Sequence, residues 1–544
     1  MSRNMIFKLA RPENEPILSY RAGSKEKAEI KAKIAELKQE VIEIPLIIGG
    51  KEVKTGNIGK IRIPHNHQHL LAKYHQAGKN EVEMAIEAAK TAKYAWERTP
   101  WQQRVAIFQK AAALLAGPSR ALINASTMLG QSKNVFQAEI DAACEMIDFL
   151  RFNCYFLTEI YQDQPESTPE EINSLEYRPL EGFVFAVPPF NFTSIGGNLT
   201  TAPALMGNTV LWKPASTAIY SNYFLMKLLM QAGLPAGVIN FIPGSGSQVG
   251  PHVLDSPDLA GIHFTGSVGV LNSMYKTVGN KIDRYRTYPR IVGETGGKDF
   301  IFAHKTAEPD ALVTALVRGA FEYQGQKCSA ASRAYLPESI WNQIKDKLVK
   351  TTEALKMGPV EDFTNFINAV IDQKAYDSIT AYIDYARKSS EAEILTGGNY
   401  DHTEGYFIRP TIVVTGNPAF KLLEEEIFGP VLTIYLYPDH KFEETLQLCD
   451  QTSPFGLTGS IFAHDNKAIA KARDILTHSA GNFYINDKPT GAVVGRQPFG
   501  GGRASGTNDK AGSKWNLMRW ISPRVIKENL LPPQDYPYPF MEEE

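Results

Sequence analysis

Between residues 182 and 264 short apolar runs alternate with helical segments, and this alternation constrains the fold more than any other feature of the chain. Runs that are apolar on both faces and separated by helices form the strands of a parallel α/β sheet. Ligands of such a sheet bind at the carboxyl ends of the strands. The predicted strands are 182–187, 209–212, 238–242 and 261–264, with helical segments at 220–232 and 249–254.

A second α/β unit follows, with predicted strands at 299–303, 333–336, 431–437 and 459–463. The chain has 544 residues, which is more than one hydrophobic core usually supports. Residues 81–156 upstream show the helical period of apolar residues instead. We therefore expect an α/β protein of more than one domain, preceded by a helical region.

Three further segments have simpler patterns. Residues 24–44 predict a surface helix capped by Ser24 and ended by Pro45, and residues 46–53 predict a short hairpin. Residues 163–181, rich in Gln, Pro, Glu and Ser, predict a loop or a protruding hairpin. The tail after Ile521 is rich in proline and tyrosine, so we expect it to lie extended across a neighbour.

Charge and cysteine content exclude several classes of protein. The formal net charge is −2 and no long Lys/Arg block occurs, so the expected partner is a small molecule and not nucleic acid. The four cysteines lack zinc-site spacing and fit a reducing compartment, so no metal site is expected. The N-terminus has no long apolar segment, and no apolar run approaches the roughly 20 residues that cross a bilayer. We expect no membrane contact and a cytoplasmic protein, or a mitochondrial matrix protein in a eukaryotic source.

Three strand ends carry residues suited to a nucleotide. The 265–269 segment, Thr-Gly-Ser-Val-Gly, is a glycine-bearing turn into a helix whose amides can face a pyrophosphate, although such glycines also serve plain strand-to-helix turns. Lys213 and Ser216 follow another strand and offer a cation and a hydroxyl. Gly244 follows a third strand in an open turn. Together the three strand ends suit one nucleotide.

Three residues are candidates for aldehyde chemistry. Cys328 follows Gly325 closely enough for the backbone to turn and present a nucleophilic sulfur, although most unpaired cysteines are buried small hydrophobes. Glu294 lies between glycines and could act as a general base, or be a surface carboxylate in a turn. Asn191 could donate to an oxyanion, or only form a turn after prolines.

Seven motifs in order along the chain resemble the aldehyde dehydrogenase family. They begin at Pro189, Lys213, Phe264, Glu294, Gly325, Glu425 and Pro498, and read PFNF, KPA, FTGS, ETGGK, GQKC, EEIFGP and PFGG. Within the family the chain most closely resembles the dehydrogenases of L-glutamate γ-semialdehyde, on segments 137–143, 177–183, 321–330 and 503–509.

The resemblance implies a fold, a cofactor and a reaction. The implied fold is α/β and aldehyde dehydrogenase-like, with a Rossmann-type NAD-binding domain (1–162 and 183–292), an α/β catalytic domain (293–486), and a small β oligomerisation flap with anchor loop and tail (163–182 and 487–544). Cys328 would attack the aldehyde, Asn191 would hold the oxyanion, and Glu294 would activate the water that hydrolyses the thioester. The implied NAD contacts are Pro188, Lys213, Ser216, Gly244, Gly266, Ser267, Val268, Gly269, Val270, Glu426 and Phe428.

The same resemblance implies a substrate with an α-carboxylate and an α-ammonium. Ser329, Gly491 and Ala492 would anchor the carboxylate. Glu145 would lie near the ammonium, unless it is only a solvated helix residue. Phe192 and Phe499 would wall the aliphatic stem. A broader-specificity aldehyde dehydrogenase, and an NAD-binding protein without catalysis, stay open as alternatives.

Two departures concern the cofactor. Ser216 stands where many NAD-using relatives carry a glutamate, so NADP could be tolerated, but no arginine stands at that strand end and NAD is the expected cofactor. Leu271 stands where many relatives have a second glycine, which leaves the seating of the pyrophosphate open. A homodimer or larger even homo-oligomer is expected, and a separate proline dehydrogenase is a candidate transient partner.

Overall fold

The computed structural model describes residues 8–543. Within them the N-terminal half is built on a seven-stranded sheet of order β11-β10-β7-β8-β9-β2-β3. Five of these strands run parallel, and the β2–β3 hairpin forms one edge antiparallel to β9. The strands are β7 (Phe183–Val187), β8 (Thr209–Trp212), β9 (Ile239–Phe241), β10 (Leu259–Thr265), β11 (Arg290–Glu294), β2 (Leu46–Ile48) and β3 (Lys51–Val53).

The order of the strands creates a crevice beside β7. The chain runs from β7 outward to β9, then returns to place β10 on the other side of β7. Loops after β7 and β10 therefore diverge, which opens a ligand site at their carboxyl ends. The connecting helices are α7 (Thr193–Leu205), α8 (Ile219–Ala232), α9 (Gly246–Leu254) and α10 (Val268–Asn280).

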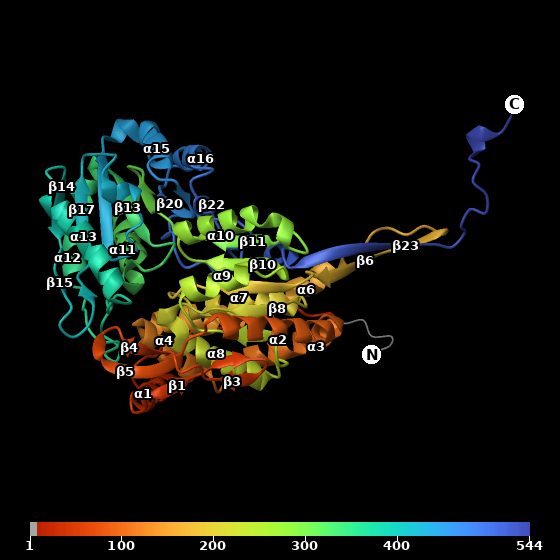
Figure 1. The fold of residues 1–544 in the computed structure, drawn as a ribbon. Coiled ribbons are helices and arrows are strands. Elements are labelled where there is room, and N and C mark those ends of the chain that lie inside the picture. Colours follow the sequence, from red (N-terminus) through yellow and green to blue (C-terminus); the bar gives the residue numbers. More distant parts are fainter. Residues whose placement is uncertain (1–7, 544) are drawn as a thin grey trace.

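The C-terminal half contains a second sheet, again of seven strands within the described chain, of order β14-β17-β18-β13-β12-β20-β21. Only its edge strand β14 pairs antiparallel. Figure 1 shows this half lying beside the N-terminal half, with α15 and α16 at its top. Its main elements are β12 (Asp299–Ala303), β13 (Ala331–Pro337), β14 (Ala392–Thr396), β17 (Thr411–Thr415), β18 (Val431–Tyr437), β20 (Thr458–Phe462), β21 (Asn482–Ile485), α11 (Pro309–Phe321), α12 (Glu338–Glu353), α13 (Gln373–Lys388), α15 (Phe442–Gln451) and α16 (Asn466–Ile475).

The helix predicted over 24–44 is too long. Helix α1 (Lys25–Leu37) is capped by the Ser24 side chain as expected, but it ends well before Pro45. Residues Ile42–Ile44 form strand β1, which pairs parallel with β5 (Asn66–His75). The β-branched isoleucines of this segment favour a strand. Ile44 is fully buried in it, whereas Val41, just before the strand, is half exposed.

The helical region upstream consists of α2 (Lys79–Arg98), α3 (Trp101–Ala116), α4 (Arg120–Gln131) and α6 (Glu145–Gln162). The helix predicted over 137–156 is interrupted. A π-helical turn, Glu139–Cys144, joins the short α5 (Val135–Ala138) to α6. Such turns widen a helix and often occur at functional sites. This one lies beside the site described below.

A two-stranded ribbon projects from the body of the molecule (Figure 1). Strand β6 (Glu171–Pro179) pairs antiparallel with β23 (Ile521–Asn529), near the C-terminal end. The prediction of a loop or a protruding hairpin within 163–181 is wrong about the pairing, because β6 pairs with a strand some 350 residues later in the chain. A local sequence pattern cannot reveal so distant a partner. No helix within residues 8–543 is both long and apolar enough to span a bilayer.

Candidate active site

Two cavities meet at Cys328. The large cavity has a volume of about 1120 Å³ and lies at the carboxyl ends of β7, β8 and β10. The small cavity has a volume of about 70 Å³ and lies toward α6 and the loop at 490–492. Cys328 lines both cavities, and so does Thr265 at the end of β10. A sulfur in this position can react with a molecule in one cavity while a second molecule fills the other.

The cysteine loop, residues 322–329, has an unusual backbone. Tyr323, Gln324 and Gly325 take φ values of 51°, 55° and 67°, in the left-handed region. This conformation costs roughly 1–2 kcal/mol for each non-glycine residue, so surrounding contacts must impose it. The Tyr323 hydroxyl donates to the Gln131 carbonyl at 2.8 Å. The Gln324 amide donates to the Ala369 carbonyl at 2.8 Å.

Gly325 is required for this loop to pack. A Cβ there would lie 2.2 Å from the Gly429 carbonyl oxygen, which is closer than atoms can approach. The turn that the sequence suggested for this glycine is therefore present, and it brings the cysteine loop against the segment that carries Glu426 and Phe428.

The Cys328 thiol is held in its protonated form. Burial raises its pKa well above the ordinary value, and the carboxylates of Glu294, Asp299 and Glu426 raise it further. Its own backbone N–H, which points at the sulfur, acts in the opposite direction. The thiol must therefore lose a proton to a neighbouring base when it attacks.

Glu294 is the base best placed for this. It ends β11, lines the small cavity together with Cys328, and pairs with Gly506 in an isolated β-bridge. Burial raises the pKa of Glu294 to about 8; Lys510 opposes the rise and Asp509 adds to it. A carboxyl group with this pKa can both accept and release a proton near neutral pH.

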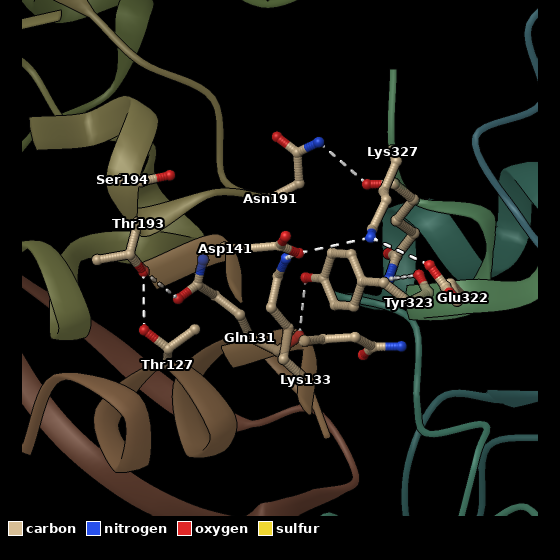
Figure 2. A network of polar contacts seen from close by, with 12 residues as sticks. Thr127, Gln131, Lys133, Asp141, Asn191, Thr193, Ser194, Glu322, Tyr323 and Lys327 are labelled. Atoms are coloured by element: carbon tan, nitrogen blue, oxygen red, sulfur yellow. Dashed lines mark hydrogen bonds and ion pairs between the residues drawn. The ribbon is translucent and has the colours of Figure 1, made fainter. Parts of the chain in front are cut away.

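Asn191 lies near the end of the loop between β7 and α7 and is almost fully buried. Its side-chain amide donates to the Gln326 carbonyl at 3.0 Å, as Figure 2 shows beside Lys327. That bond uses one N–H and fixes the amide against the cysteine loop. The second N–H is free to act with the Cys328 backbone N–H as an oxyanion donor.

The large cavity suits a dinucleotide. Lys213 lines it and is 8% exposed, and its ammonium has no hydrogen bond or ion pair among the described residues. Burial lowers its pKa to about 8. Helix α10 begins at the cavity wall. The side chain of its N-cap residue, Ser267, accepts no hydrogen bond from the first backbone N–H groups of the helix, so these amides are uncapped. An unpaired cation and free helix amides are the groups that bind ribose and phosphate oxygens.

Most of the predicted cofactor residues surround this cavity. Glu426 accepts from the Gly297 backbone at 3.1 Å, and burial raises its pKa to about 7. Phe428, with φ 55°, packs edge-on against Phe190. The large cavity is lined by Pro188, Lys213, Gly266, Ser267, Gly269, Val270, Glu426 and Phe428. Ser216, Gly244 and Val268 belong to the same strand ends but do not line it.

All six predicted substrate residues line the small cavity, namely Glu145, Phe192, Ser329, Gly491, Ala492 and Phe499. The Ser329 hydroxyl lies 2.8 Å from the Thr490 hydroxyl, which ties the cysteine loop to the anchor loop, residues 490–492. Gly491 takes φ +93°, a conformation suited to glycine. Glu145 accepts from the Ser194 hydroxyl, and its pKa is raised to about 8 by burial and by Asp141.

The sequence motifs did not single out a group of charged residues beside the small cavity. Asp141 and Lys327 line this cavity, and Figure 2 shows Lys327 between Asp141 and Glu322. Lys133 pairs with Asp141 and lies 4.3 Å from the Phe192 ring centre. Asp141 and Glu322 do fall within the segments that carry the family resemblance, whereas nothing in the sequence marks Lys133. Within residues 8–543, no cluster of His, Cys, Asp or Glu is arranged to hold a metal ion.

Known proteins resemble this chain in sequence and in fold. Residues 54–526 match the aldehyde dehydrogenase family. The chain is 54% identical over 533 residues to the mitochondrial delta-1-pyrroline-5-carboxylate dehydrogenase of Dictyostelium discoideum. The aligned region covers 97% of this chain and 96% of the relative. The fold of this chain is similar to that of the NAD-bound delta-pyrroline-5-carboxylate dehydrogenase of Mycobacterium tuberculosis, with a TM-score of 0.96 and 48% identity. The match covers 99% of this chain and 100% of that one. The fold is also similar to that of proline utilization A of Bdellovibrio bacteriovorus, with a TM-score of 0.92, 30% identity, and coverage of 98% of this chain and 55% of that one.

Proposed function

The chain belongs to the aldehyde dehydrogenase family, and from that premise we propose that it oxidises L-glutamate γ-semialdehyde to L-glutamate with NAD. The semialdehyde is the open form of Δ1-pyrroline-5-carboxylate, so the reaction is the second step of proline catabolism. One observation carries the proposal most strongly. Cys328 lies where a cavity suited to a dinucleotide meets a small cavity with a carboxyl group on one side and free backbone amides on another.

The reaction begins with attack of the Cys328 sulfur on the aldehyde carbon. The thiol proton passes to a base, for which Glu294 is the candidate, and a carbon–sulfur bond forms. The carbonyl oxygen becomes an oxyanion, and the Asn191 amide and the Cys328 backbone N–H donate to it. Both donors are already held by the fold, so little reorganisation is needed.

Bound NAD would accept the hydride that leaves the same carbon, and Lys213, Gly266, Ser267, Glu426 and Phe428 would hold it. A thioester on Cys328 is then left on the protein. Glu294 first releases the thiol proton to solvent; its carboxylate then deprotonates a water, which adds to the thioester carbon and expels the sulfur. The expelled thiolate takes the proton from Glu294, and L-glutamate is released. A free carboxyl base beside the sulfur favours hydrolysis over transfer of the acyl group to another thiol.

Recognition of the substrate head would use both sides of the small cavity. Ser329 and the amides of Gly491 and Ala492 would bind the carboxylate, while Glu145 would accept from the ammonium. Phe192 and Phe499 would pack on the aliphatic carbons between them. An aldehyde that lacks the carboxylate and the ammonium would not make these contacts, because its methyl end would leave the polar groups of the small cavity unpaired.

We also propose a homodimer or larger even assembly, with the β6–β23 ribbon as the pairing element. The similarity to proline utilization A makes a separate proline dehydrogenase a candidate transient partner. The cytoplasm is the predicted compartment, with the mitochondrial matrix as the alternative because the Dictyostelium relative is named as mitochondrial.

Steady-state kinetics test the function directly. We expect kcat/KM for L-glutamate γ-semialdehyde to exceed that for pentanal by at least about 100-fold, since pentanal lacks both head groups. NAD and NADP are compared in parallel, with NAD preferred. Equal efficiency with the two aldehydes would instead identify an aldehyde dehydrogenase of broad specificity.

A further inference from the structure

Five side chains of alternating charge form a continuous chain along the small cavity. In order they are Lys133, Asp141, Lys327, Glu322 and Lys488, and we call them the charge chain. Lys133 is paired with Asp141, and Lys327 lies 3.7 Å from both Asp141 and Glu322. Lys488 lies 3.8 Å from Glu322. Figure 2 shows the first four members meeting between elements of both halves of the molecule.

Two members of the charge chain differ in sign and in place, namely Asp141, its second member, and Lys488, its last. Asp141 lies on the π-helical turn just before Glu145, on the side where the substrate ammonium is expected. Lys488 lies at the last position, where its ammonium donates to the Thr490 carbonyl at 2.9 Å. A Cβ built on Gly491 would be only 2.9 Å from the Lys488 nitrogen. The Lys488 charge is therefore directly beside the anchor loop.

The two lysines that flank Asp141 are removed from water. Lys133 is fully buried and Lys327 is 7% exposed. Although burial lowers the pKa of Lys327, the carboxylates of Asp141, Glu322 and Glu145 outweigh it, and the net shift is upward. Charges in such surroundings are weakly screened and act over several ångströms.

From this arrangement we propose that the charge chain is a specificity device for the α-carboxylate of the substrate: Lys488 provides positive potential at the anchor loop, whereas the charge of Asp141 is offset by the two lysines that flank it. Glu322 is a positioning residue, because it holds Lys488 against the anchor loop. The inference rests on the proposed function and adds to it, since the anchor amides and the Ser329 hydroxyl are neutral donors and carry no net charge.

Two matched aldehydes isolate the carboxylate contribution. Glutaric semialdehyde has the carboxylate and chain length of the natural substrate but lacks its amino group, and pentanal lacks both. In Lys488→Met we expect kcat/KM for glutaric semialdehyde to fall about 10- to 100-fold through KM, which is the usual effect of losing a charged partner. Pentanal kinetics should change less than about threefold, as it has no carboxylate to recognise.

Three further comparisons guard the result. Lys488→Arg keeps the charge and should recover most of the lost efficiency. Lys471→Met removes a lysine of the same half whose partner is Glu443 at the surface, and should behave as the unaltered enzyme. The preference for glutamate semialdehyde over glutaric semialdehyde should persist in Lys488→Met, because the ammonium side is intact.

Glu322→Gln provides a second variant that keeps size and hydrogen bonding. Glu322→Gln should lower kcat/KM for glutaric semialdehyde, as Lys488→Met does, and adding it to Lys488→Met should cause little further loss. An equal fall in kcat/KM for pentanal, or no fall in kcat/KM for glutaric semialdehyde, would overturn the inference. A wild-type enzyme that does not prefer the glutamate semialdehyde over pentanal would instead refute the proposed function, so the two failures are distinguishable.

Discussion

At the scale of single residues, Cys328 and Glu294 share one environment that holds both in their neutral forms. Burial is the first cause of the raised pKa of each, and each carboxylate near Cys328 makes ionisation of the thiol harder. A neutral thiol is a weak nucleophile and is also slow to oxidise. The resting site is therefore protected, and attack must be coupled to proton transfer.

Turnover should depend on pH through Glu294. Its pKa is raised to about 8, so the carboxylate form is the minority at pH 7 and becomes dominant above pH 8. We expect kcat to rise between pH 6.5 and 9 wherever thioester hydrolysis limits the rate. Glu294→Gln should form its first NADH slowly, because the thiol loses its base, and should stall after about one NADH per site. Steady turnover by this variant, or a flat wild-type profile, would contradict the assigned role.

Alkylation of Cys328 should report its protonation. Because its pKa is raised well above the ordinary value, iodoacetamide should label it slowly at pH 7 and progressively faster above pH 9. Mass spectrometry of the labelled peptide measures the rate, and Cys328→Ala, which should lack dehydrogenase activity, is the control. Rapid labelling of the free enzyme at pH 7 would show that the thiolate is already present.

Site residues could be predicted where a short motif carries them. The six substrate candidates lie in four segments of the chain, yet each lines the small cavity. The charge chain could not be predicted in this way. Lys133 meets Asp141 only through the π-helical turn, and Lys488 meets Glu322 across more than 160 residues of chain, which no local pattern reveals.

At the scale of elements, the buried strands were the easiest to predict. The predicted strands at 209–212, 299–303 and 431–437 agree with β8, β12 and β18 residue for residue, because a run that is apolar on both faces has few alternatives in a parallel sheet. Short pieces were harder. Strand β1 and the π-helical turn depend on tertiary partners, and each was predicted as continuous helix.

The cysteine loop should be intolerant of a side chain at Gly325. In Gly325→Ala the added Cβ would meet the Gly429 carbonyl oxygen at 2.2 Å, and alanine is also strained at φ +67°. We expect the free energy of unfolding to fall by about 2–3 kcal/mol, and kcat to fall as well, because the loop carries Cys328. Urea denaturation and steady-state kinetics measure the two effects.

Gly416→Ala is the matched control for that substitution. Gly416 is exposed, and a Cβ there would meet nothing within 4 Å. Stability and activity should therefore stay close to those of the unaltered protein. If both alanine variants behaved alike, the close approach at Gly325 would not govern the loop.

At the scale of the whole molecule, the ribbon is the part least supported by its own chain. It projects from the body, and Ile172 and Val525 on its two strands are 47% and 65% exposed. Apolar side chains on a projecting ribbon fit a surface that is covered in an assembly.

Light scattering should therefore report at least twice the 60.3 kDa chain mass at micromolar concentration. The double variant Ile172→Glu with Val525→Glu should shift the mass toward one chain, since charge on the covered surface opposes association. Val41→Glu, at a half-exposed site away from the ribbon, should leave the mass unchanged. A monomeric unaltered protein would reject the assembly.

The pairing of β6 with β23 also determines when the ribbon can form during synthesis of the chain. Strand β6 leaves the ribosome early, but its partner strand is synthesised some 350 residues later. Until residue 529 emerges, both edges of β6 lack a partner strand. In the proposed assembly, subunits would therefore associate through the ribbon only after translation has passed this point, and a chain whose synthesis stops early would be excluded.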